Sequence, residues 1–139
     1  MNLGLEEVRE SIRKFNGILP YCAQDFIVRN CFDRDSDDWD ERCTILSTRV
    51  EALASAFRAT RAGAPARHEL ASGAFAKYYW NLVDSKKESL TSLSEQNIRL
   101  FSEALDEVEH AINRREGVFV SKLLHWSFPS AFPMMDGRS

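Results

Sequence analysis

Positively charged side chains are concentrated in the middle of the sequence. Arg58, Arg61 and Arg67 fall within a ten-residue stretch, and His68 follows the last of them. Guanidinium groups bind phosphate oxygens, and the aromatic residues of the nearby run 77–80 (Lys-Tyr-Tyr-Trp) could stack on a nucleobase. The sequence therefore predicts DNA binding at Arg58, Arg61 and Arg67. The alternative is that Arg58 and Arg61 complement the negative end of the preceding helix and that the aromatic residues belong to the core.

An acidic stretch resembles the start of a calcium loop but is incomplete. Residues 33–37 carry Asp at every second position, as such a loop does. The loop also needs Gly at its sixth position and Glu at its twelfth, where this sequence has Asp38 and Thr44. The stretch instead predicts a solvated turn in which Asp38 caps the next helix, with Glu41 three residues later.

Glu107 and His110 have the Glu-x-x-His spacing of di-iron helical bundles, and Glu103 lies on the same helical face. A di-iron site needs a second copy of this spacing and further inward Glu residues, which the remaining histidines do not supply. The sequence also contains no Gly-x-Ser-x-Gly segment and no glycine-rich phosphate loop. We therefore predict neither a metal site nor a cofactor.

The least generic segment spans residues 117–136, GVFVSKLLHWSFPSAFPMMD. In it, Ser-Lys-Leu-Leu-His leads through two prolines to an Asp, which resembles a pattern in uncharacterised prokaryotic proteins. That pattern is similar in turn to the catalytic region of helix-hairpin-helix DNA glycosylases of the 8-oxoguanine type. The resemblance covers about 20 of the 139 residues. It implies that Lys122 is the amine nucleophile that forms a Schiff base with the sugar, and that Asp136 is the carboxylate that assists it.

The same segment also fits an interpretation without catalysis. A short helix over 118–126 would close the bundle and carry Lys122 at its surface. Trp126, Phe128 and Phe132 would then seal the apolar core.

Length and composition predict one soluble domain. The chain has 139 residues, of which 44% are hydrophobic and 28% charged, and its net charge is -3. This negative charge argues against nucleic-acid binding through overall basicity. The N-terminus lacks the regions of a signal peptide and no apolar stretch is long enough to span a membrane, so we expect a cytoplasmic protein. Cys22, Cys31 and Cys43 are expected to be reduced thiols in the core.

Apolar residues recur at intervals of three and four along most of the chain, which predicts an all-α fold. We expect a single domain over residues 1–139, a compact bundle of five to six amphipathic helices. Pro129 and Pro133 predict an extended C-terminal tail. The expected helices are 4–16, 20–31, one that starts near Trp39 and carries a heptad seam as far as Gly63, 66–84, 95–115 and 118–126.

Together these features favour a non-catalytic binding or assembly module. Its partner is a protein or, with weaker support, DNA, and no membrane is expected. The heptad seam that starts at Trp39 would favour a homodimer if it is wider than the core requires. The alternative function is that of a DNA glycosylase or abasic lyase that uses Lys122 and Asp136, with the three arginines on phosphate.

Overall fold

The computed structural model describes residues 20–86, 95–129, 131 and 132. Within these residues the regular elements are all α-helices, as the sequence predicts, and none combines the length and apolar character that crossing a bilayer requires. The predicted helix 4–16 lies outside the described residues. The six described helices are α2 (Pro20–Phe32), α3 (Trp39–Phe57), α4 (Ala64–Ser72), α5 (Ala74–Lys86), α6 (Glu95–Ile112) and α7 (Gly117–Ser127).

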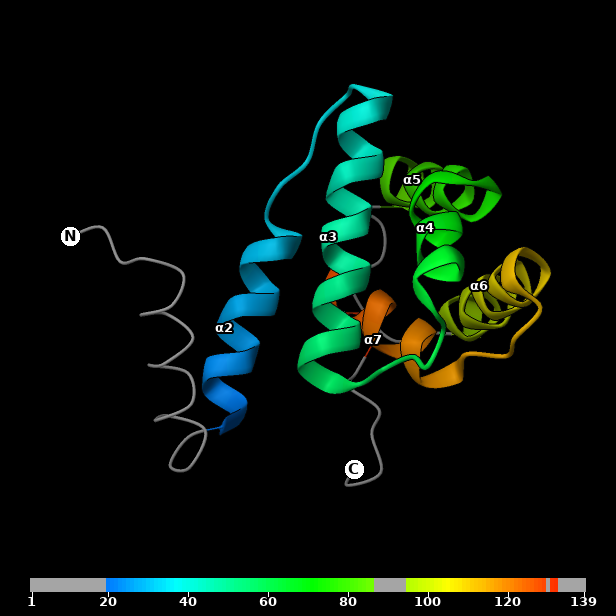
Figure 1. The fold of residues 1–139 in the computed structure, drawn as a ribbon. Coiled ribbons are helices and arrows are strands. Elements are labelled where there is room, and N and C mark those ends of the chain that lie inside the picture. The colour runs from blue at the N-terminus through cyan, green and yellow to red at the C-terminus, as the bar shows by residue number, and fades with distance from the viewer. Residues whose placement is uncertain (1–19, 87–94, 130, 133–139) are drawn as a thin grey trace.

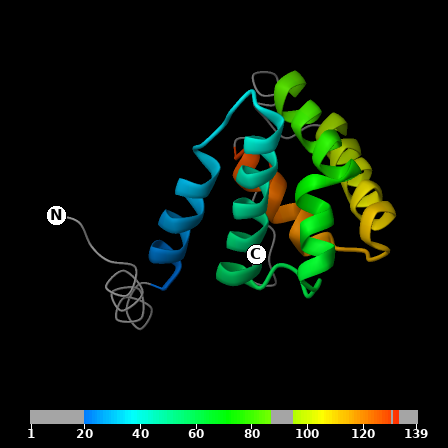
Figure 2. The same ribbon diagram turned by 45° about the horizontal axis from the view of Figure 1, so that its top comes forward.

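Helix α3 lies at the centre of the bundle. It contacts α2, α4, α5 and α7. Figures 1 and 2 show α2 running antiparallel to α3 on one side, with α4, α5 and α6 on the other. Helix α7 contacts α2, α3 and α6, and it therefore links the two sides of the bundle.

The heptad seam of α3 faces this core. Leu46, Val50 and Leu53 are completely buried, whereas Trp39 at the start of the helix is 39% exposed. The central seam residues therefore pack within the chain itself, and the homodimer stays a prediction.

The segment predicted as one helix over 66–84 is divided into α4 and α5 at Gly73. This residue ends α4, and its N–H donates to the carbonyl oxygen of Glu69 at 2.8 Å. A Cβ atom at Gly73 would lie 2.9 Å from that carbonyl oxygen and nearer still to the Glu69 side chain. A side chain at this position would therefore press against the last turn of α4.

We expect Gly73→Ala to lower the free energy of unfolding by about 1 to 3 kcal/mol, because the new methyl group overlaps backbone that is fixed by α4. Urea denaturation measures this change. Gly117→Ala is the matched control, since a Cβ at Gly117 meets no atom within 4 Å. That variant should be stabilised by about 0.5 kcal/mol through loss of unfolded-state entropy. Equal effects of the two substitutions would contradict the prediction.

Two helices end earlier than the sequence predicts. Helix α3 stops six residues before Gly63, because Arg58 adopts the left-handed conformation with φ 50° and ψ 41°. Helix α6 stops at Ile112 instead of residue 115 and is followed by Asn113 at φ 56°. Both positions are those at which glycine usually terminates a helix. The early endings place arginine residues in loops.

The start of α3 is capped nearly as predicted. The Asp38 carboxylate accepts a hydrogen bond from the Glu41 N–H at 3.0 Å. The return bond of the capping box passes through Ser36, whose hydroxyl donates to the Glu41 carboxylate at 2.5 Å and accepts from the Asp38 N–H at 3.1 Å. The acidic turn is therefore held by its own hydrogen bonds.

The chain turns back after α7. The N–H groups of Ala131 and Phe132 donate to the carbonyl oxygen of Phe128 at 3.0 and 3.1 Å, so the described start of the predicted tail is a turn. Phe128 and Phe132 are buried and Trp126 packs against the core, as the non-catalytic interpretation predicts. The tail from residue 133 onward lies outside the described residues.

Cys31 and Cys43 are free thiols. Both are half-buried, so the expectation that they lie in the core was wrong for these two residues. Burial raises the pKa of each thiol above its usual value. The Cys22 side chain lies outside the described residues.

Candidate functional site

A pocket surrounded by arginine side chains lies where α3 ends and α7 begins. Its volume is about 320 Å³, and it is lined by residues 58–61 and 114–118. We call it the arginine pocket. The left-handed residues Arg58 and Asn113 direct the two loops that form it, one after α3 and the other before α7. The pocket therefore joins two segments that are more than fifty residues apart in the sequence.

Four arginines of this pocket are in different electrostatic states. Arg114 lies 3.0 Å from the buried Glu116 carboxylate in an ion pair that lacks hydrogen-bond geometry. Arg115 is bonded to Glu109 at 2.5 Å, and this hydrogen bond raises the pKa of its guanidinium further. Arg58 and Arg61 are exposed and form no ion pair within the described part of the chain. Two positive charges are thus left for an external anion.

The first turn of α7 adds to the positive potential of the arginine pocket. The N-cap residue Glu116 makes no side-chain hydrogen bond to the first turn, and Gly117 and Val118 line the pocket. Helix N-termini carry partial positive charge and free N–H donors. The lining contains no Cys, His or Lys that could serve as a nucleophile or general base. This arrangement can bind an anion.

The structure separates the three arginines that were predicted to bind DNA. Arg58 and Arg61 lie together in the arginine pocket, whereas Arg67 lies outside it and is half-buried. Its guanidinium donates to Glu51 at 2.7 Å and to the carbonyl oxygen of Ala62 at 2.6 Å. Arg67 therefore fixes the loop before α4.

Sequence reasoning missed Arg114 and Arg115. A signal for them was present, since they are adjacent basic residues between the end of one helix and the glycine that starts the next. The prediction of a helix to residue 115 concealed it, because it placed both side chains on an exposed helical surface.

Two of the three rings of the aromatic run 77–80 are not available for stacking on a base. Tyr79 and Trp80 are 1% and 2% exposed and belong to the core, as the alternative interpretation stated. Arg42 and Arg49 lie over the Trp80 ring, with guanidinium carbons 4.5 and 5.0 Å from its centroid. The ring is therefore already in contact with two cations of the chain itself.

Lys122 is buried on α7. It is 5% exposed, and its Nζ atom lies 4.8 Å from the centroid of the Phe57 ring. The expectation of a surface lysine was therefore wrong. Lys122 does not line the arginine pocket. Asp136 lies outside the described residues.

Comparisons with family models, with curated proteins and with solved structures find no match to this chain.

The described residues contain no group of three or more His, Cys, Asp and Glu side chains that could hold a metal ion. In the acidic turn, Asp35 is bonded to the Ser36 N–H and paired with Arg42. Burial raises the pKa of Tyr78 to about 12. The negative charges of Glu103 and Glu107 on α6 contribute to this shift.

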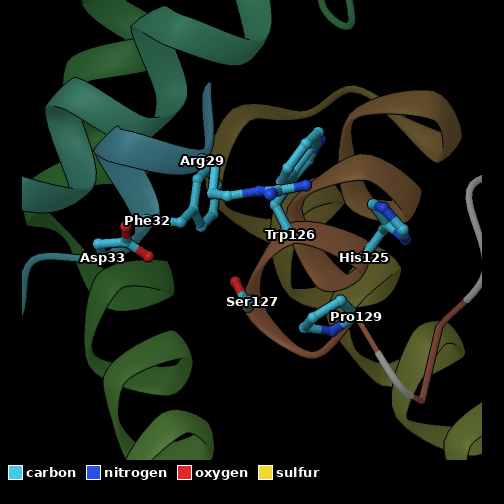
Figure 3. Close-up of a pocket in the computed structure, with 7 residues that line it drawn as sticks. All are labelled: Arg29, Phe32, Asp33, His125, Trp126, Ser127 and Pro129. Atoms are coloured by element: carbon cyan, nitrogen blue, oxygen red, sulfur yellow. The ribbon is translucent and has the colours of Figure 1, made fainter. Parts of the chain in front are cut away.

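A second pocket lies at the other end of α7, against the end of α2. It measures about 550 Å³ and is lined by Arg29, Phe32, Asp33, His125, Trp126, Ser127 and Pro129. We call it the aromatic pocket. Figure 3 shows the Arg29 side chain extended from α2 toward α7, with Asp33 and His125 on opposite sides. Sequence analysis identified none of its charged residues as a ligand-binding group.

Proposed function

We propose that this protein is a non-catalytic binding module that contacts the phosphate backbone of nucleic acid, DNA in the first instance, through the arginine pocket. The supporting observation is the convergence of Arg58, Arg61, Arg114 and Arg115 on one pocket. Planar guanidinium groups that approach from several directions suit the tetrahedral, multiply charged phosphate better than a single carboxylate.

The rest of the arginine pocket fits a polymer with apolar as well as charged parts. Val118 is 53% exposed beside the arginines, and it offers an apolar contact for a sugar or a base face. The remainder of the chain is acidic enough to give a net charge of -3. Binding is therefore local, of moderate affinity and strongly dependent on salt.

Fluorescence anisotropy with short labelled duplex and single-stranded DNA tests this proposal. At about 50 mM salt we expect micromolar dissociation constants, and a plot of log K against log salt should have a slope of about -2 to -4. The slope counts the phosphate contacts. An absence of binding at that salt concentration, or a slope near zero, would refute a phosphate-binding function.

A cytoplasmic location belongs to the same proposal. Cys31 and Cys43 are unpaired, which suits a reducing compartment. The proposed function does not involve binding to a membrane.

A DNA glycosylase or abasic lyase is the second candidate function, and the position of Lys122 on α7 favours it. Lys122 is 5% exposed and lies on the helix whose N-terminus lines the arginine pocket. Bound DNA would therefore contact the same helix that carries the amine.

Borohydride trapping on duplex DNA with an abasic site or 8-oxoguanine distinguishes the two functions, because only a Schiff base is captured covalently. If Lys122 is the nucleophile, we expect an adduct that disappears in Lys122→Gln and decreases in Asp136→Asn. Circular dichroism must first show that Lys122→Gln is folded. Failure to trap an adduct on either DNA, while anisotropy still detects binding, would reject the lyase and leave the binding module.

A further inference from the structure

The aromatic pocket carries two opposite charges on one side. Arg29 is in the last turn of α2, Asp33 directly follows the helix end, and both residues line the pocket. Both side chains are exposed, and neither forms an ion pair within the described residues. A cation and an anion therefore face the same pocket and remain available to a ligand.

The apolar wall of the aromatic pocket is held in place by ring contacts. Trp126 stacks on Phe57 at a centroid distance of 6.2 Å and an interplanar angle of 16°. His125 meets the Trp126 ring edge-on at 5.3 Å and 81°. Pro129 completes this wall. Little side-chain entropy has to be lost when an apolar group binds to such a fixed surface.

The hydrogen bonds of the remaining polar groups indicate binding without a reaction. Ser127 Oγ donates its proton to the Leu123 carbonyl oxygen at 2.7 Å and lies 2.6 Å from the Tyr79 hydroxyl. The Ser127 hydroxyl therefore has no further proton to donate to a ligand. His125 Nδ1 lies 2.7 Å from the Phe132 carbonyl oxygen and must carry the proton. His125 Nε2 is then a hydrogen-bond acceptor in the neutral ring.

We propose that the aromatic pocket binds a small zwitterion with an aromatic group, namely an aromatic α-amino acid. Its carboxylate would pair with Arg29, its ammonium group would pair with Asp33, and its ring would pack on Trp126 and Pro129. The volume of about 550 Å³ accommodates a ligand of this size. This site is separate from the arginine pocket, since it lies at the opposite end of the eleven-residue helix α7.

Isothermal titration calorimetry with L-phenylalanine and its two half-ligands tests the proposal. 3-Phenylpropionate keeps the carboxylate, and phenethylamine keeps the ammonium group. We expect L-phenylalanine to bind at least about fivefold more tightly than either half-ligand, because each charge-assisted pair contributes separately at this partly solvated site. Equal affinity for all three compounds, or tighter binding of guanosine than of L-phenylalanine, would overturn the assignment.

Two variants test which charged group of the ligand each pocket residue binds. Arg29→Gln should weaken L-phenylalanine and 3-phenylpropionate by about fivefold and leave phenethylamine unchanged. Asp33→Asn should weaken L-phenylalanine and phenethylamine and leave 3-phenylpropionate unchanged. Arg34→Gln and Asp37→Asn are the matched controls, since both residues are exposed and lie outside the pocket. If the controls have the same effects as the pocket variants, the proposal is wrong.

Discussion

Arg49→Met should lower the free energy of unfolding by about 3 to 5 kcal/mol, the largest loss expected from a single substitution of a charged residue in this chain. Arg49 lies on α3 and is 5% exposed. Within the described residues it forms no ion pair with a carboxylate. Its partners are instead backbone carbonyl groups and aromatic rings.

The guanidinium of Arg49 caps the end of α2. It donates to the carbonyl oxygens of Cys31 at 3.3 Å, Phe32 at 3.4 Å and Arg34 at 2.5 Å. The last carbonyl groups of a helix have no partner within the helix and carry partial negative charge. A buried cation at this position therefore replaces both the missing hydrogen bonds and a counter-ion. Methionine would leave these acceptors without a donor.

The same guanidinium continues into a polar chain. It donates to the Tyr79 hydroxyl at 2.7 Å, which lies 2.6 Å from Ser127 Oγ on α7. Arg49 thus ties α2 to α3, α5 and α7. Because α2 otherwise lies at one edge of the bundle (Figure 2), we expect its amide hydrogens to lose protection first in Arg49→Met.

Urea denaturation and hydrogen exchange measure this prediction. Arg49→Lys keeps the positive charge but lacks the planar guanidinium group. Its free energy of unfolding should fall by about half as much as that of Arg49→Met. Tyr79→Phe should be destabilised less than either variant, and the double-mutant cycle gives the Arg49–Tyr79 coupling. Arg34→Met is the control, because its side chain is exposed and only its carbonyl group takes part. A loss below about 1 kcal/mol in Arg49→Met would contradict the capping role.

The sequence predicts the helices where periodicity and capping agree. The predicted helix 20–31 ends one residue before α2 does. The predicted helix 118–126 starts one residue after the first residue of α7 and ends one residue before its last. Their boundaries are local, since the residue types of Pro20 and Gly117 are themselves the signals. The break at Gly73 was not predicted, because its position follows from the close approach to Glu69.

The functional surfaces depend on contacts that local patterns do not contain. The arginine pocket exists because Arg58 adopts a left-handed conformation that its residue type rarely takes. Arg49 is buried because the end of α2 needs a cation there, whereas an arginine on an amphipathic helix is normally predicted to be exposed. Lys122 was misplaced for the same reason. In each case tertiary structure decides the environment of a charged side chain.

Arg58→Asn/Arg61→Ala should weaken DNA binding by about tenfold to a hundredfold at low salt, and it should reduce the salt slope by about 2. Asn is chosen at position 58 because it tolerates the left-handed conformation. Neither residue forms an ion pair in the described structure, so no buried carboxylate is left without a partner. Arg114 is left unchanged, because its removal would isolate the buried Glu116.

A charge-matched variant separates the pocket from the overall field of the protein. Arg34→Ala/Lys77→Ala removes the same two positive charges from exposed positions outside the arginine pocket. We expect this variant to change affinity by less than about threefold and to keep the wild-type salt slope. If both double variants weaken binding equally, DNA is attracted by net charge alone and the arginine pocket is not the site.

Gly117→Ala tests the arginine pocket without any change of charge. The new methyl group has open space in the free protein, since no atom lies within 4 Å of it, but Gly117 lines the pocket where a phosphate would approach the helix backbone. The variant should therefore be slightly more stable than the wild type and bind DNA about threefold to tenfold more weakly. Opposite changes in stability and affinity are not expected from general damage to the fold, which lowers both. Unchanged affinity in a stabilised Gly117→Ala protein would instead place the phosphate on the arginine side chains alone, away from the α7 N-terminus.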